Sequence, residues 1–166
     1  MPPTGSTNLG ELAAADSVKV FLARAGFDLT EENADAVIAA CRGTDGLPLA
    51  LELEGARARV EGLDVVDSTF SNSSTNAATA ADHPDAIDDA LRRTMTTLSD
   101  EEVDYFARLS VFHGPFSREL AVGMWTDGAS ARRMLTSLVR TALVQRLGEV
   151  GRYRHPLTYA GHLDRQ

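Results

Sequence analysis

The chain has 166 residues, of which 43% are hydrophobic, and its formal net charge at pH 7 is -8. This length suits one domain or two small ones, whereas no apolar run approaches the roughly 18 residues that cross a bilayer, and the first residues lack the order of a secretory signal. We therefore expect a cytoplasmic protein without a membrane partner, and the acidic charge argues against nucleic acid as a partner of this chain alone.

Three short helices are predicted in the first 64 residues. The first begins at an Asp16 cap and ends at Gly26, and the second begins at Thr30 and ends at Gly43. Both carry apolar residues at helical spacing. The apolar stripe of the second includes Cys41, the only cysteine, so intrachain disulfides and multi-thiolate metal sites are excluded.

The third predicted helix follows a turn, and Pro48 is acceptable only in its first turn. Its apolar residues are expected on one side of the helix: Leu49, Leu53, Ala56 and Val60. We interpret residues 1–64 as a compact helical bundle.

Residues 65–85 are rich in Ser, Thr, Asn and Ala and have few apolar residues to bury, which predicts a flexible linker. Helical spacing resumes after Pro84. Ser99 and the acidic residues after it then cap a helix with Val103 and Phe106 inside. A second domain is therefore expected to begin at residue 86.

Residues 86–166 follow the order of a winged helix. Helices are predicted at about 117–124 and 129–139, and extended runs at 142–147 and 152–155 are joined by a glycine-containing turn. The predicted fold class is thus mainly α, with a small helical bundle joined by a flexible linker to a winged-helix domain that has a short β-hairpin.

The sequence contains no complete catalytic or metal site. It lacks the Gly-x-x-x-x-Gly-Lys-Ser/Thr loop that binds phosphate and the Gly-x-Ser-x-Gly turn of serine hydrolases. The four histidines, His83, His113, His155 and His162, are far apart and lack the paired spacing of zinc hydrolases. We predict no enzyme activity, no metal site and no cofactor for the chain in isolation.

Two strings resemble motifs of the NB-ARC group of STAND signalling ATPases. GLPLA at 46–50 is similar to the motif of that name in these proteins. TLSDEE at 97–102, followed by FARLSVF at 106–112, resembles the start of their winged helix in bacterial LuxR-type and SARP-type regulators. The resemblance covers about residues 9–160, and it implies an ARC-like helical bundle at 1–64 and a winged helix at 86–166.

The resemblance implies a non-catalytic regulatory module that acts by domain packing and by closure over ADP when a P-loop domain is present. By residue matching, Pro48 corresponds to the proline that packs near adenine, and His155 to the histidine that meets the β-phosphate. ADP or ATP would then bind only beside a P-loop NTPase domain. The expected partners are that domain, other regulator domains or other proteins.

The chain departs from the family pattern in several places. The P-loop, the acidic magnesium-binding strand and the sensor arginine would lie before Met1. Arg93 stands where tryptophan is frequent, and Pro156 replaces an acidic residue. These departures are compatible with a fragment, a split gene or a degenerate remnant.

A second interpretation is a DNA-binding winged-helix transcriptional regulator. The third helix of the winged-helix domain, predicted from about residue 129, carries Arg132 and Arg133 and, at its end, Arg140, and the wing carries Arg152 and Arg154. Because the apolar residues of that helix must face the core, only a short basic surface is expected to remain for a DNA groove.

Overall fold

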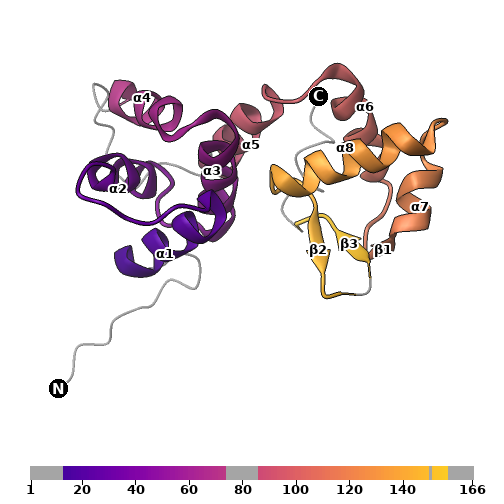
Figure 1. The fold of residues 1–166 in the computed structure, drawn as a ribbon, viewed down its shortest axis with the longest axis horizontal. Helices are drawn as coiled ribbons and strands as arrows, with labels where there is room; N and C mark the ends of the chain where they lie inside the picture. The colour runs from indigo at the N-terminus through magenta and orange to yellow at the C-terminus, as the bar shows by residue number, and fades with distance from the viewer. Residues whose placement is uncertain (1–12, 74–85, 150, 157–166) are drawn as a thin grey trace. The chain divides into compact units, whose positions relative to one another are not determined.

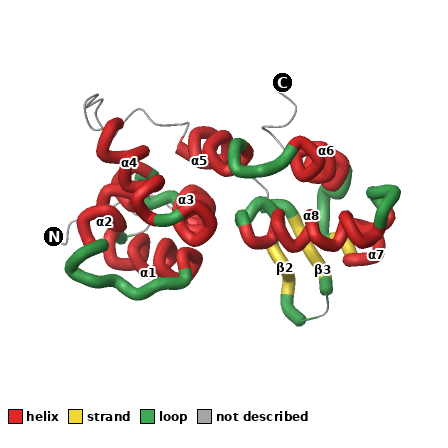
Figure 2. Tube along the Cα trace, turned by 45° about the horizontal axis from the view of Figure 1, so that its top comes forward, coloured by secondary structure: helices red, strands yellow, loops and turns green. Residues whose placement is uncertain are grey.

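The computed structural model describes residues 13–73, 86–149 and 151–156, which form eight helices and one three-stranded sheet (Figure 1). Helix dominates these residues, and the strands are short (Figure 2). The prediction of a mainly helical fold with a winged-helix-like part is confirmed. The chain divides into two compact units, Met1–Ile87 and Asp88–Gln166. In the described ranges, no helix is long and apolar enough to cross a membrane.

Four helices build the first unit: α1 (Ala14–Ala25), α2 (Ala34–Gly43), α3 (Pro48–Glu61) and α4 (Leu63–Ser73). Helix α1 packs on α3, and α2 packs on α4 (Figure 1). Their shared core consists of small and apolar side chains, namely Phe21, Ala25, Val37, Ala40, Cys41, Leu51, Ala58 and Val66. Helices this short are marginal in isolation, so their stability depends on this packing.

The predicted helix ends are more accurate than the predicted starts. Helix α1 ends at Gly26, whose φ of +79° is left-handed and whose N–H donates to the Leu22 carbonyl. The sequence predicts the start of the second helix at Thr30, but α2 begins at Ala34. The reason is local, because the Asn33 side-chain oxygen accepts the Thr30 N–H at 2.7 Å and holds a turn in front of the helix.

Helix α3 is buried on more than one side. The predicted stripe is correct for Leu53 and Ala56, which are fully buried, but Val60 is 38% exposed. Ala50 and Leu51, which are outside that stripe, are also buried. The helix contacts α1 and α4 as well as α2, and this wider contact explains why a one-sided pattern described it incompletely.

The structure corrects the predicted flexible linker. Helix α4 runs to Ser73, so the first part of the segment 65–85 is helical, and its remainder lies outside the described residues. Val66 is fully buried, and Phe70 packs against Gly43 of α2. These two apolar residues are four positions apart, so they hold one side of the helix on the core despite its polar composition.

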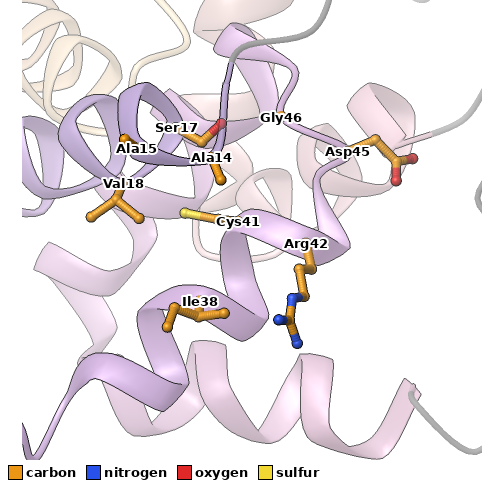
Figure 3. A pocket seen from close by; sticks show the side chains of 9 residues that line it. All are labelled: Ala14, Ala15, Ser17, Val18, Ile38, Cys41, Arg42, Asp45 and Gly46. Atoms are coloured by element: carbon orange, nitrogen blue, oxygen red, sulfur yellow. The ribbon is translucent and has the colours of Figure 1, made fainter.

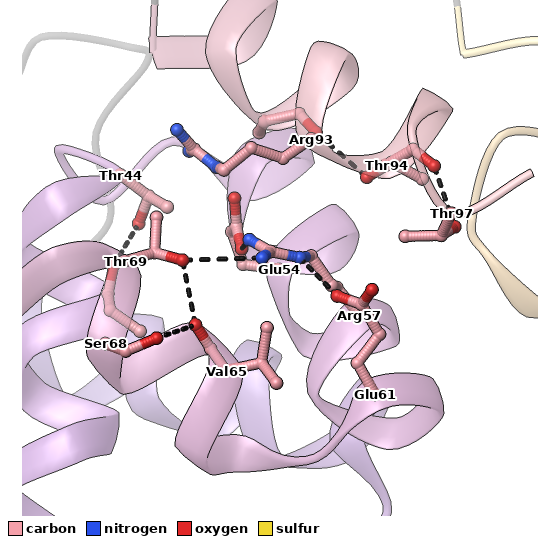
Figure 4. A network of polar contacts seen from close by, with 12 residues as sticks. Thr44, Glu54, Arg57, Glu61, Val65, Ser68, Thr69, Arg93, Thr94 and Thr97 are labelled. Atoms are coloured by element: carbon pink, nitrogen blue, oxygen red, sulfur yellow. Dashed lines mark hydrogen bonds and ion pairs between the residues drawn. The ribbon is translucent and has the colours of Figure 1, made fainter.

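Arg57 forms a polar network that joins α3 to α4 (Figure 4). Its Nη1 lies 3.4 Å from the carboxylate of Glu54, which is fully buried, and its Nε donates to Glu61 at 2.6 Å. Its Nη2 donates to the Thr69 hydroxyl of α4 at 3.4 Å. The arginine therefore gives a buried carboxylate a charged partner, without which its burial would be strongly unfavourable.

Helix α5 (Ala86–Met95) contains the division between the two units. The remaining elements are α6 (Asp100–Leu109), β1 (Phe116–Ser117), α7 (Arg118–Gly123), α8 (Gly128–Arg140), β2 (Gln145–Leu147) and β3 (Arg152–Arg154). The strands form an antiparallel sheet in the order β1-β3-β2, in which Tyr153 pairs with Phe116 on one side and with Arg146 on the other. Strand β1 was not predicted, because two residues are too short to give a periodic pattern.

The chain changes direction sharply after α8. Ala142 has a φ of +65°, a left-handed conformation that is uncommon for residues other than glycine. The Val144 N–H donates to the Leu138 carbonyl, and Leu143 and Val144 are fully buried. Residues 142–144, which the sequence predicts as extended, instead form the buried turn that leads into β2.

Aromatic side chains form much of the second core. The ring of Phe116 in β1 stacks on Phe112 and on Tyr153, with centroids 5.0 and 6.1 Å apart. Tyr105 of α6 donates its hydroxyl to the Ala121 carbonyl of α7 at 2.8 Å and meets Trp125 edge to face. These contacts join α6, α7 and the sheet.

We predict that Gly55→Ala destabilises the first unit by about 1 kcal/mol. A methyl group at Gly55 would lie 2.7 Å from the Phe21 carbonyl oxygen and 3.0 Å from the Arg24 Cβ, so α1 and α3 would have to separate. Such overpacking costs about 1–3 kcal/mol, and the better helix propensity of alanine offsets only about 1 kcal/mol of it.

The measurement is urea unfolding followed by circular dichroism. Gly123→Ala is the control, because among the described residues no atom beyond its chain neighbours and its own helix backbone lies within 4 Å of the added methyl group. Equal unfolding midpoints for the two variants would contradict the close approach of α1 to α3.

Candidate functional site

Helix α8 carries the predicted DNA contacts, and its N-terminus is capped by Asp127. The carboxylate accepts the N–H groups of Ala129 and Ser130 at 3.1 and 3.0 Å. The hydroxyl and N–H of Ser130 are the largest causes that hold the pKa of Asp127 below its ordinary value. The residues of α8 that the sequence predicts to face the core are buried: Ala131, Met134, Leu135 and Leu138.

The three predicted arginines of α8 are all exposed. Arg133 donates from Nη2 to the Ser130 hydroxyl at 2.8 Å, so it is tied to the capped N-terminus. Arg132 and Arg140 are eight residues apart, which is about 12 Å along a helix, with the exposed Thr136 between them. These two side chains thus form an extended basic strip on the surface of α8.

The wing adds further arginines. Arg152 and Arg154 flank the buried Tyr153 in β3, so they lie on the opposite face of the sheet from it. Arg154 donates to the side-chain oxygen of Gln145 on β2 at 3.1 Å. Arg146 in β2 is also exposed, and it was not among the predicted contacts although it belongs to the same predicted hairpin.

The charge balance of this region differs from that of the whole chain. Between residues 128 and 156 the sequence has six arginines and one acidic residue, Glu149. Glu102 of α6 interacts electrostatically with Arg140. Burial, the largest influence, raises the pKa of Glu102, but hydrogen bonds from Ser137 and Ser99 together with Arg140 hold it below its ordinary value. Arg140 therefore has a partly compensating carboxylate.

Pro48 is the first residue of α3 and is exposed. The preceding Leu47 has an extended backbone, as expected before proline, and a proline needs no N–H at the first helical position. The local conformation is explained by helix initiation alone. The adenine contact inferred from the resemblance remains a prediction.

His155 is packed inside the second unit. Its Nε2 donates to the Leu109 carbonyl at 2.9 Å, and its ring lies 5.5 Å from the rings of both Phe106 and Phe116. Its Nδ1 is buried and has no hydrogen-bond partner in the part of the chain that the structure describes. The carbonyl of Leu143 could accept a hydrogen bond from Nδ1 only when the ring is protonated.

Burial is the main cause that lowers the pKa of His155 below its ordinary value of 6.5, and it outweighs the opposing effect of the Leu109 and Leu143 carbonyls. In this position the His155 ring makes its contacts with residues of the second unit. Pro48 belongs to the first unit and His155 to the second, so a nucleotide contact shared by them remains a prediction. Within the described ranges, no group of three or more His, Cys, Asp or Glu side chains is placed to hold a metal ion.

Comparison with known proteins shows which class of protein this chain resembles. No protein-family model matches the chain. In an alignment 155 positions long that covers 86% of the chain, the chain is 32% identical to proteins of Mycobacterium bovis and Mycobacterium tuberculosis whose names describe them provisionally as HTH-type transcriptional regulators. The chain is similar to mycobacterial regulators. It spans 18% of the length of these relatives, so the match concerns a small part of each.

We predict that the second unit loses stability as the pH falls from about 7 to 5, and that His155→Gln reduces this loss. The pKa of His155 is lower in the folded state than in the unfolded state, so unfolding takes up a proton in this range. The stabilisation is complete above the ordinary pKa of 6.5 and is lost as the pH falls toward the folded value.

Urea unfolding at several pH values, followed by the fluorescence of Trp125, measures this effect. Trp125 is the only tryptophan, and it contacts Tyr105 in the same unit. His113→Gln is the control, because His113 is exposed. The same pH dependence in the wild type and in His155→Gln would exclude His155 as its source.

Proposed function

We propose that the chain is a segment of a transcriptional regulator and that its winged-helix unit contacts DNA through α8 and the β2–β3 wing. The observation that carries the proposal is the exposed basic strip of α8, with Arg132 and Arg140 two helical turns apart. The name of the mycobacterial relatives supports it, since helix-turn-helix regulators place a recognition helix in the major groove.

The net charge of -8 is a weaker objection to DNA binding than the sequence alone indicates. At physiological ionic strength the screening length is about 8 Å, so a phosphate responds mainly to the charges next to it. The six arginines between residues 128 and 156 outnumber the acidic residues beside them, which are Glu149 of the same segment, the α8 cap Asp127 and Glu102 of α6. A duplex that approaches this surface would therefore meet a locally positive field.

The exposed arginines suit two different kinds of contact. Arg132 lies in the first turns of α8, where a recognition helix meets base edges, and a guanidinium can donate two hydrogen bonds to guanine. Arg152 and Arg154 in the wing would be placed to contact phosphates, which position the protein without reading the sequence. Arg133 is tied to Ser130 and would contribute mainly by its charge.

We predict that Arg132→Gln with Arg140→Gln weakens duplex binding and flattens its salt dependence. Removing one arginine–phosphate interaction reduces the slope of log K against log salt by about 0.9, so the slope of the double variant should fall by up to about two units. Fluorescence anisotropy with a labelled random duplex at several salt concentrations measures the slope.

The control is Arg59→Gln with Arg92→Gln, which removes the same charge from exposed arginines of α3 and α5. Equal slopes for the two double variants would show that α8 is not the DNA-contacting surface. A selection from random duplexes at about 0.15 M salt then tests specificity, and an enriched motif that disappears on Arg132→Ala with Arg133→Ala would assign base reading to this helix.

A second candidate function is the non-catalytic half of a STAND-type nucleotide switch. The specific observation in its favour is the GLPLA string at 46–50, with Pro48 exposed at the start of α3. In that role the chain would act by packing on a P-loop domain and closing over ADP. The winged-helix arginines would then face protein or phosphate instead of DNA.

We predict that the purified chain does not bind ADP at low micromolar concentration, because Pro48 and His155 can supply only edge contacts to a nucleotide. Calorimetry with ADP and magnesium tests this. Clear micromolar binding would mean that the chain has a phosphate site of its own. With a P-loop domain joined to the chain, the switch role requires that ADP binding appears and weakens on Pro48→Ala.

A further inference from the structure

The first unit contains a cavity of about 500 Å³ between α1 and α2 (Figure 3). Its wall consists largely of small apolar side chains, including Ala14 and Val18 from α1 and Ile38 and Cys41 from α2. A volume of this size is within the range of small-molecule sites, which are mostly apolar with a few polar groups.

Two charged residues lie at the edge of this cavity, Arg42 and Asp45. Arg42 is exposed, and its guanidinium makes no hydrogen bond or ion pair with the residues that the structure describes. Figure 3 shows the side chains of Arg42 and Asp45 extending apart, with the guanidinium on the side of Ile38. The cavity thus has an apolar interior with a cation at one margin and an anion at another.

We propose that this cavity binds a small monocarboxylate with an apolar chain, whose carboxylate pairs with Arg42 while the chain lies against Val18, Ile38 and Cys41. The apolar wall favours removal of the chain from water, and the guanidinium has donors that match a carboxylate. Asp45 disfavours a second anionic group, so a monoanion is preferred to a dianion.

The proposed site is separate from the nucleotide and DNA contacts. Pro48, the residue matched to adenine binding, does not line the cavity, and all of the lining residues belong to the first unit. Loss of DNA binding on substitution of the α8 arginines would therefore leave this proposal untouched.

Cys41 provides a direct test of occupancy. It is the only cysteine, it is 8% exposed, and its sulfur is directed toward Ala14 and Val18 (Figure 3). Burial raises the pKa of its thiol to about 11, so its reaction with a small neutral alkylating agent should be slow and measurable. A ligand in the cavity would slow the reaction further.

The experiment uses the full chain with decanoate, decanol and the dicarboxylate sebacate as probes. Decanoate is expected to bind saturably below about 1 mM and to slow alkylation of Cys41, and sebacate to bind more weakly. Arg42→Gln should weaken decanoate binding about fivefold and leave decanol unchanged, because an exposed ion pair contributes little more than this.

Two further variants control the result. Ala15→Trp introduces a bulky side chain at an exposed position of the cavity wall and should block both decanoate and decanol. Arg59→Gln removes an exposed arginine that does not line the cavity and should change neither affinity. Circular dichroism confirms that each variant is folded.

Three results would overturn the proposal. Non-saturable uptake of decanoate would indicate detergent-like adsorption. Binding that persists in Ala15→Trp would place the ligand elsewhere. Equal loss of decanoate and decanol binding in Arg42→Gln would show that the guanidinium does not recognise the carboxylate.

Discussion

The apolar face of α8 determines what the second unit can present to a partner. Ala131, Met134, Leu135 and Leu138 are buried, and their helical spacing leaves the other side of the helix to Arg132 and Arg140. The same burial fixes the position of the sheet, since the turn after α8 is closed by a hydrogen bond from Val144 to Leu138. Because one set of side chains makes both the core and the turn, the basic strip and the wing are held in a defined relation within the unit.

The sequence predicted those features correctly that depend on the residue pattern within one helix. The end of α1 at Gly26, proline at the start of α3 and the inward residues of α8 follow from spacing and capping within one helix. Helix α4 was missed because a polar composition suggested a linker, although Val66 and Phe70 anchor it. Strand β1 was missed because it has only two residues and because its partner, Tyr153, lies far away in the sequence.

The same distinction between local and distant contacts applies to the candidate site residues. The exposure of Arg132, Arg133 and Arg140 could be predicted, because it follows from the apolar spacing of their own helix. The environment of His155 could not be, since the Leu109 carbonyl that binds its Nε2 is 46 residues earlier. The resemblance assigned a ligand to this histidine, but it could not give the packing of the ring on Phe106 and Phe116. Contacts between distant segments emerge only when the fold is known.

The left-handed residue between α8 and the wing has a consequence for how this unit can change in sequence. Ala142 is held at a φ of +65°, which costs an alanine about 1 kcal/mol relative to glycine. Related chains should accept glycine there freely, whereas a β-branched residue would have to leave this conformation. A residue that leaves the left-handed conformation would change the orientation of the hairpin relative to α8. The distance between the arginines of the hairpin and those of the helix would then change as well. One backbone angle thus sets the spacing of two groups of positive charge.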